Sequence, residues 1–162
     1  MAKKAASCNY WLMKTEPNEF SIDDLVASPN QTTFWFGVRN YQARNMLRDG
    51  VKLGDQVLFY HSSCAEPAVV GIATVVREAY ADPTALDPKS DYFDAKSSAD
   101  NTRWFVVDLK LVEKLKRPIT ITEMRAHDAL TEMLLLRKGN RLSVLPTTAD
   151  QFAYIVKLAK KK

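Results

Sequence analysis

The sequence predicts an α+β protein built on a curved, mostly antiparallel, barrel-like sheet with short helices around it. Segments of strand character and of helical character follow each other without the β-α-β alternation that a parallel sheet requires. One continuous β-branched run, AVVGIATVVREAY (68–80), is typical of a central strand. The 162 residues can bury one core, and 46% hydrophobic and 26% charged residues are ordinary for a globular protein.

Four segments are expected to form strands, because each combines β-branched or aromatic residues with alternating or continuous apolar character. They are YWLMKT (10–15), DQVLFYHSS (55–63), AVVGIATVVREAY (68–80) and RWFVVDLKLVEKL (103–115). The second and third are expected to pair, and Gly71 in the third allows a β-bulge. RLSVLP (141–146) adds a short extended piece, and the polar stretch 81–102 is expected to be a long loop.

Helices are expected where a capping side chain precedes a run with helical spacing. Ser21 begins a short helix over 21–28, and Asn40 begins one over 41–49 that Gly50 ends. Capping boxes open the later helices: Thr120 with Glu123, for a helix to about His127, and Thr148 with Gln151, for the terminal helix. The terminal helix carries one apolar stripe, made of Phe152, Ile155, Val156 and Ala159.

A single domain is expected over residues 10–159, between a flexible N-terminal tail (1–9) and a basic C-terminal tail (160–162). The opening MAKKAASCNY lacks the apolar segment of a signal peptide, so we expect a cytoplasmic protein with Cys8 and Cys64 as free thiols. No apolar run approaches the roughly 18 residues of a membrane span, so no membrane partner is expected. The sequence leaves the oligomeric state open, and a monomer is the default expectation.

The net charge of +4 permits nucleic acid as a partner without requiring it. Part of this charge lies in tail lysines that aid solubility. The rest recurs close to aromatic residues, as in a groove for a phosphate backbone, at Lys14, Arg39, Arg44, Arg103, Lys138 and Arg141.

The sequence offers little support for catalysis, a metal or a cofactor. No glycine-rich phosphate-binding motif occurs, and two cysteines and two histidines are too scattered for a zinc site. Asp87, Asp91 and Asp94 lack EF-hand spacing and are expected in a solvated loop. His61 and Ser62 are neighbours on a strand and point to opposite faces. We therefore expect a non-enzyme, the alternative being an enzyme that acts on a nucleoside with His61 as general base.

The stretch FWFGVRNYQARN (34–45) is too polar for a buried strand and too aromatic for an ordinary loop. A pocket for a planar heterocycle needs a ring to stack on, groups that hydrogen-bond to the ligand's edges, and cations where a phosphate comes with it. This stretch supplies all three, in Trp35, Asn40 and Arg39.

The sequence resembles the EVE-domain family over nearly its whole length. The matching segments, in family order, are YWLMKTEP (10–17), WFGVRNYQARN (35–45), GDQVLFYHSS (54–63), VVGIATVVREAYAD (69–82), DPKSDYFD (87–94), RWFVVDL (103–109) and GNRLSVLP (139–146). The resemblance implies a PUA-like fold, related to the YTH and ASCH domains, with a cleft that holds a nucleobase. The implied ligand is a modified base, a modified cytosine in DNA; an RNA-binding module is the alternative.

The resemblance also implies which residues line the cleft. They are Lys14, Thr15, Trp35, Val38, Arg39, Asn40, Tyr60, His61, Ser62, Trp104, Arg141, Leu142 and Ser143. Either Trp35 or Trp104 is expected to stack on the base, and Asn40 and Ser62 to read its edge. Phosphate is expected to face Arg39, Lys14 and Arg141. A reader of this kind needs an effector protein, which the sequence does not identify.

Overall fold

The computed structural model describes residues 9–161. The expected N-terminal tail therefore lies, except for Asn9, outside the described residues, as does Cys8. Cys64 is a free, partly buried thiol. No helix in the described part is long and apolar enough to cross a membrane.

Six strands form one sheet. They are β1 (Tyr10–Thr15), β2 (Thr32–Phe34), β3 (Gln56–His61), β4 (Ala68–Ala81), β5 (Phe105–Thr120) and β6 (Val144–Thr147), in the order β2-β5-β4-β3-β1-β6. Only the β1–β3 pair is parallel, so the predicted, mostly antiparallel sheet is confirmed. The sheet curves as a barrel does but stays open, because within residues 9–161 the edge strands β2 and β6 each pair on one side only.

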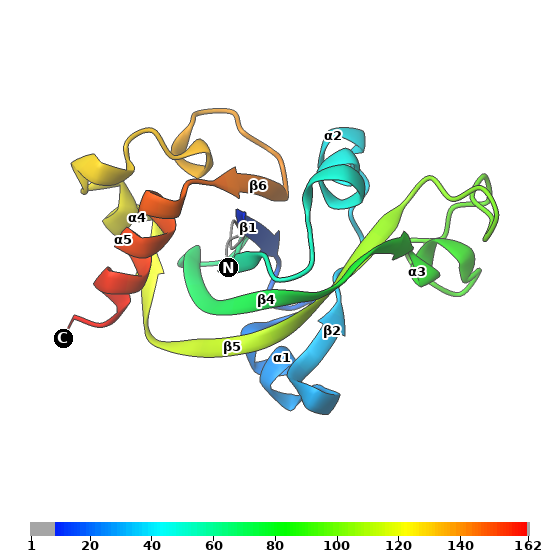
Figure 1. Cartoon of the computed structure of the whole chain (residues 1–162), viewed down its shortest axis with the longest axis horizontal. Coiled ribbons are helices and arrows are strands. Elements are labelled where there is room, and N and C mark those ends of the chain that lie inside the picture. The colour runs from blue at the N-terminus through cyan, green and yellow to red at the C-terminus, as the bar shows by residue number, and fades with distance from the viewer. Residues whose placement is uncertain (1–8, 162) are drawn as a thin grey trace, which may run out of the picture.

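The curvature comes from β4 and β5, the two longest strands, which sweep together across the molecule in Figure 1. Their pairing shifts register at four places, and each bulge bends the ladder. One shift lies between Val69 and Gly71, which confirms the bulge expected at Gly71. A side chain at Gly71 would collide with Ile22 and would meet the Glu113 carbonyl oxygen, so this close approach of α1 to the sheet requires glycine.

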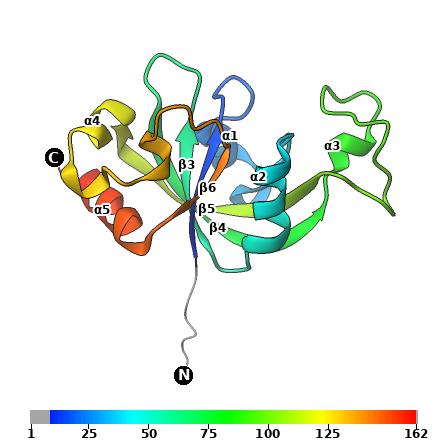
Figure 2. The same ribbon diagram turned by 90° about the horizontal axis from the view of Figure 1, so that it is seen from above.

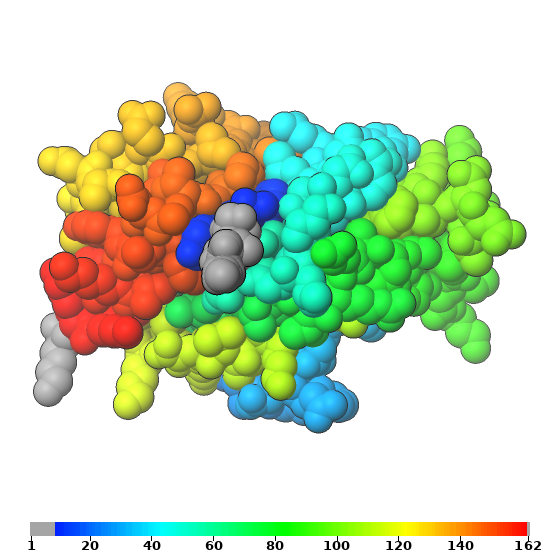
Figure 3. Space-filling model, in the orientation of Figure 1, coloured from blue at the N-terminus to red at the C-terminus, as the bar shows by residue number. Residues whose placement is uncertain are grey.

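Short helices surround the sheet. The α-helices are α1 (Ile22–Ala27), α2 (Tyr41–Asn45), α3 (Pro83–Leu86), α4 (Ile121–Arg125) and α5 (Ala149–Ala159). Single turns of other types are η2 (Pro29–Gln31), η3 (Met46–Gly50), η4 (Asp128–Leu130) and η5 (Leu134–Leu136). Figure 2 shows α4 and α5 at one end of the sheet and α3 with the following loop at the other. Figure 3 shows these two ends as opposite sides of one continuous surface.

Both faces of the sheet are buried, because alternate residues of the inner strands point to different cores. Trp11 and Met13 of β1 join one core with residues of α1, α2 and η3, while Leu12 joins the other with residues of α4 and α5. Trp35 and Val38 belong to the first core. The candidate site therefore forms on the face that α1 and α2 cover.

The predicted caps are largely confirmed. Ser21, Asn40 and Thr148 accept hydrogen bonds from the first turns of α1, α2 and α5, and α2 runs on through η3 to the predicted end at Gly50. Thr120 caps α4, but the expected capping box there is wrong, because the Glu123 carboxylate binds Arg117 instead.

Two predicted element lengths also need correction. The last long strand continues to Thr120, five residues beyond its predicted end, and α4 ends at Arg125 instead of about His127. The predicted loop 81–102 contains the short helix α3, which Asp82 caps. Isolated periodicity could not reveal these boundaries, because tertiary contacts set them.

Candidate functional site

A cavity of about 350 Å³ opens where the ends of β1 and β3 meet the segment after β2. It is lined by Lys14, Thr15, Glu16, Glu19, Phe20, Phe34, Trp35, Phe36, Gly37, Val38, Ser62, Ser63, Tyr92, Arg141 and Ser143. This volume is at the lower end of the roughly 300–1,000 Å³ of small-molecule sites. The cavity therefore suits a small ligand.

One wall of the cavity is aromatic. The Phe36 ring lies 5.5 Å from Phe34, 6.4 Å from Phe20 and 5.7 Å from Tyr92, measured between ring centroids. Trp35 lies deeper, 5% exposed, and meets Phe59 edge to face at 5.3 Å. These rings come from three distant segments, and together they offer an apolar surface to a flat ligand.

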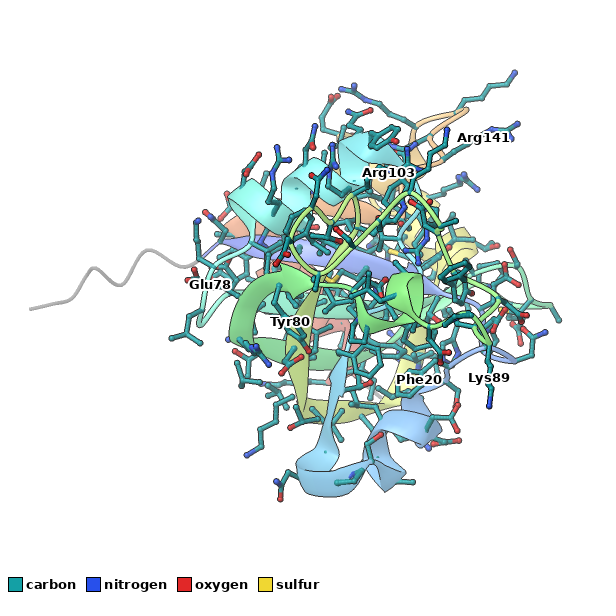
Figure 4. The ribbon with its side chains drawn as sticks, turned by 90° about the vertical axis from the view of Figure 1, so that its right-hand side faces the viewer. Phe20, Glu78, Tyr80, Lys89, Arg103 and Arg141 are labelled. Atoms are coloured by element: carbon teal, nitrogen blue, oxygen red, sulfur yellow. The ribbon has the colours of Figure 1, made fainter. Side chains whose placement is uncertain are left out.

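The other wall of the cavity is polar. Ser62 and Ser63 follow β3, and Ser143 precedes β6 and accepts a hydrogen bond from the Lys14 backbone. Ser63 has a left-handed backbone (φ 53°), a strained state for a residue with a side chain, and such strain often occurs at functional sites. Burial lowers the pKa of the Lys14 ammonium, which has no hydrogen bond or ion pair among the described side chains. Arg141 is exposed and projects from the segment that leads into β6, as Figure 4 shows.

The aromatic segment after β2 is held in place by Asp82, whose carboxylate is fully buried. Its Oδ2 accepts hydrogen bonds from the Gly37 N–H (3.3 Å) and from Arg39 Nη1 (3.0 Å), and its Oδ1 accepts two from Thr84. Arg39 Nη2 in turn donates to the Tyr92 carbonyl oxygen at 2.6 Å. Asp82 and Arg39 thus join both aromatic segments of the cavity wall.

Gly37 allows this wall to close. Its φ of +82° lies in the left-handed region, and a Cβ there would stand 3.0 Å from Cζ of Tyr92. The Tyr92 ring can therefore lie directly on the Gly37 backbone, and its hydroxyl donates to Glu19 at 3.4 Å.

A second anchor fixes the loop that carries Tyr92. Asp94 Oδ2 accepts hydrogen bonds from Arg103 Nε (2.8 Å) and Trp104 Nε1 (2.7 Å). Desolvation alone would raise the pKa of Asp94, but hydrogen bonds from the Lys96 N–H, Arg103 and Trp104, with the charge of Arg103, lower it to about 2. Asp94 thus fixes the acidic loop to Arg103 and Trp104. Among residues 9–161, no group of three acidic, histidine or cysteine side chains is arranged to hold a metal ion.

The structure brings part of the predicted set to the cavity: Lys14, Thr15, Trp35, Val38, Ser62, Arg141 and Ser143. The remainder lies elsewhere: Arg39, Asn40, Tyr60, His61, Trp104 and Leu142. These six do not line this cavity, and each has a structural partner that explains its place. Whether any of the thirteen residues touches a ligand stays a prediction.

The side chains of Trp104 and Asn40 contact other parts of the protein instead of the cavity. The Trp104 ring stacks on Tyr41 (4.9 Å, 17°), and the guanidinium of Arg39 lies 5.2 Å from its centre. Asn40 uses its side-chain oxygen to cap α2, accepting from the Ala43 N–H. Of the two candidate stacking tryptophans, only Trp35 lines the cavity.

Tyr60, His61 and Leu142 are engaged elsewhere, with Tyr60 in the core that α4 and α5 cover. Burial, with a smaller effect of Cys64, raises the pKa of Tyr60 to about 12. His61 Nε2 accepts a hydrogen bond from the Ile22 N–H (3.1 Å), and burial lowers the pKa of His61. Its Nε2 lone pair is therefore occupied, which disfavours the alternative of His61 as a general base. Leu142 packs between the two cores.

Sequence reasoning missed part of the lining: Glu16, Glu19, Phe20, Phe34, Phe36, Gly37, Ser63 and Tyr92. Phe34, Phe36 and Gly37 lie in the aromatic stretch FWFGVRNYQARN (34–45), but Trp35, with the larger ring, was the residue predicted to bind. Tyr92 carried a signal, since an aromatic residue stands out in the polar stretch DPKSDYFD.

The open, curved sheet and the cavity at the ends of its strands define a PUA-like α+β domain with one aromatic wall and one polar wall. A family profile described as "EVE domain" matches residues 9–158, so the chain belongs to the EVE-domain family. It is 44% identical over 170 residues to thymocyte nuclear protein 1 of Gallus gallus, covering 94% of this chain and 69% of that protein.

Solved structures agree with this assignment. A hypothetical protein from Leishmania major superposes with a TM-score of 0.90 at 45% identity, covering 97% of this chain and 98% of that one. The human THYN1 protein in complex with 5-methylcytosine containing DNA superposes with a TM-score of 0.87 at 40% identity, covering 95% and 99%.

Proposed function

We propose that this protein binds DNA and holds a modified nucleobase, a modified cytosine, in the cavity, without catalysing a reaction on it. The observation that carries the proposal is the pairing of an aromatic wall with a polar wall in a cavity of about 350 Å³. Such a site gives a planar base a surface to stack on and groups that hydrogen-bond to its edge. The human relative in complex with 5-methylcytosine containing DNA supports this choice of ligand.

A base within duplex DNA must leave the stack to reach this cavity, at a cost of a few kcal/mol. Stacking on aromatic side chains contributes roughly 1–3 kcal/mol per base and offsets part of that cost. Basic side chains near the cavity, with Arg141 at its rim, suit the flanking phosphates, so affinity should fall as salt rises. A cytoplasmic monomer that passes its signal to an effector protein is part of the same proposal.

The proposal is tested by fluorescence anisotropy with matched duplexes that differ in a single central cytosine, methylated or not, at two salt concentrations. We expect a preference for the methylated duplex at both, with weaker binding of either duplex at the higher salt. An RNA strand of the same sequence runs alongside, and tighter binding of that strand would favour the RNA-binding alternative. Equal, salt-driven binding of both duplexes would contradict the proposal.

Two neighbours in one loop provide matched variants. Tyr92 lines the cavity, whereas Phe93 is 42% exposed and does not. Tyr92→Ala should reduce affinity for the methylated duplex by about 5- to 150-fold, the equivalent of one stacked base. Phe93→Ala should leave the methylation preference unchanged. These variants are preferable to Trp35→Ala, which would open a hole in the core.

A further inference from the structure

The three tryptophans differ in what their indole N–H groups bind. Trp11 donates to Asp55 at 2.9 Å and Trp104 donates to Asp94 at 2.7 Å. Trp35 lines the cavity, and its N–H has no acceptor among the described residues, although only 5% of the residue is exposed. The buried side-chain polar atoms of the described residues that lack a partner are Arg117 Nε and Thr147 Oγ1, so Trp35 Nε1 stays accessible, and an accessible, unpaired N–H beside a cavity can donate to a ligand.

Lys14, on the polar wall, is a second donor without an acceptor among the described residues. Its ammonium group reaches the cavity partly buried, and no carboxylate of residues 9–161 lies within 4 Å of it. The Thr15 hydroxyl beside it already donates to the Phe20 carbonyl oxygen, so it is not a competing donor. Two residues that line the cavity thus carry strong donors, Trp35 Nε1 and Lys14 Nζ, for which the described part of the protein provides no acceptor.

Two carboxylates, Glu16 and Glu19, line the same cavity, and neither forms an ion pair with a described residue. Beside a nucleic acid such carboxylates repel phosphate, so they are unfavourable unless they accept hydrogen bonds from the ligand. Glu19 is the better placed of the two, because the Tyr92 hydroxyl of the aromatic wall donates to it.

This set of groups complements one edge of one base. The Watson–Crick edge of cytosine has two adjacent acceptors, O2 and N3, beside the 4-amino donor. Thymine replaces the amino group with the O4 acceptor and carries a proton on N3. Two unpaired donors with a carboxylate acceptor therefore match cytosine and oppose thymine at two of three positions.

We propose that the cavity selects a cytosine-type base over thymine through this edge. Trp35 Nε1 and Lys14 Nζ donate to O2 and N3, and Glu19 accepts from the 4-amino group. The inference rests on the proposed function and adds the element that determines which base is held. Stacking cannot supply this selectivity, since 5-methylcytosine and thymine share the ring size and the 5-methyl group.

The test uses single-stranded oligonucleotides, in which no base pair has to open. One sequence carries 5-methylcytosine, thymine or 5-methyl-2-pyrimidinone at its central position; the last keeps O2 and N3 but lacks the amino group. Binding is measured by anisotropy for the wild type, Trp35→Phe, Lys14→Met and Glu19→Leu, with thermal unfolding of each variant to verify the fold. Trp11→Phe and Lys110→Met serve as controls, because they make the same changes away from the cavity.

We expect the wild type to prefer 5-methylcytosine to thymine by at least about tenfold, and 5-methyl-2-pyrimidinone to fall between them. Trp35→Phe and Lys14→Met should each weaken binding of the 5-methylcytosine strand about five- to tenfold and that of the thymine strand by less than twofold. Glu19→Leu, which has no acceptor, should make 5-methylcytosine and 5-methyl-2-pyrimidinone nearly equal. The two control variants should leave all three affinities unchanged.

Failure of this inference can be told apart from failure of the proposed function. Equal binding of the 5-methylcytosine and thymine strands would overturn the proposal that the cavity recognises the Watson–Crick edge of cytosine. The proposed function would stand if methylated duplexes remained preferred over unmethylated ones and Tyr92→Ala removed that preference. If Tyr92→Ala changes no affinity at all, the ligand does not enter the cavity, and both proposals are wrong.

Discussion

Asp82→Ala is expected to be the most damaging single change outside the two hydrophobic cores. The Asp82 carboxylate is fully buried and forms an ion pair with Arg39, whose side chain is 24% exposed. Removal of one partner of a buried pair costs about 3–5 kcal/mol, and the partial exposure of Arg39 favours the lower value of about 3. Loss of the cap of α3 adds about 1 kcal/mol.

The total, about 4 kcal/mol, corresponds to a fall in Tm of about 8–16 °C, at about 2–4 °C per kcal/mol for a chain of this size. Thermal unfolding by circular dichroism measures this fall. Asp49→Ala is the matched control: it removes the partner of Arg48 from an Arg–Asp pair in which both side chains are exposed, so Tm should hardly change.

Asp82→Asn separates the charge from the hydrogen bonds. The amide oxygen can still cap α3, but it cannot balance the charge of Arg39, so an intermediate Tm is expected. Both Asp82 variants should also weaken ligand binding, because Gly37 and Tyr92 lose their common anchor. If Asp82→Ala lowers Tm no more than Asp49→Ala does, Asp82 does not hold the cavity wall.

Three further changes test the site. Gly37→Ala should cost about 1–2 kcal/mol of stability, because its backbone is left-handed, and should displace the Tyr92 ring. We therefore expect a large loss of affinity for methylated DNA with only a small fall in Tm. A large fall in Tm with unchanged affinity would refute the role of Gly37 in packing Tyr92. The neutral form of His61 is favoured in the folded state, so its contribution to stability is complete above pH 6.5 and is lost as pH falls through the lowered folded pKa. His61→Phe should flatten the dependence of the unfolding free energy on pH, measured by urea unfolding. An unchanged pH dependence would contradict this expectation. The contribution of Asp94 is present above about pH 4 and disappears as pH falls toward 2, so Asp94→Asn should lower Tm at pH 7 and have little effect near pH 2. A constant difference in Tm across that range would contradict the last expectation.

Much of the fold could be predicted, because local signals agreed with the tertiary structure. Caps at Ser21, Asn40 and Thr148 are short-range hydrogen bonds that the sequence states directly. The bulge at Gly71 followed from a glycine in an otherwise β-branched run. The Thr120 cap shows where such reasoning stops: Glu123 had the right spacing for a capping box, yet the more distant Arg117 binds its carboxylate.

The order of the strands and the openness of the sheet could not be predicted in the same way. They depend on pairings across long stretches of chain, such as β1 with β3, for which one sequence carries no signal. The order of strand and helix segments predicted a curved, mostly antiparallel sheet, but not the order of its strands.

The site was predicted by residue type and only partly by position. Aromatic residues next to arginine and asparagine did mark the segment that lines the cavity, but Arg39 and Asn40 hold that segment instead of lining it. Their acceptors and donors, Asp82 and the α2 backbone, decide this role. A sequence pattern cannot separate a residue that faces a ligand from one that fixes its neighbour.

A comparison of two tryptophans shows why the sequence cannot make this distinction. Trp35 and Trp104 have similar sequence neighbours, and both are almost completely buried. Trp104 is satisfied within the protein, because Asp94 accepts from its N–H and Tyr41 covers its ring. Trp35 keeps a free donor beside a cavity, and that difference appears only when hydrogen bonds are counted for each group in space. The tryptophan to change first is therefore Trp35, whose N–H has no partner among the described residues, and Trp35→Phe removes that group while it keeps an aromatic ring in the core.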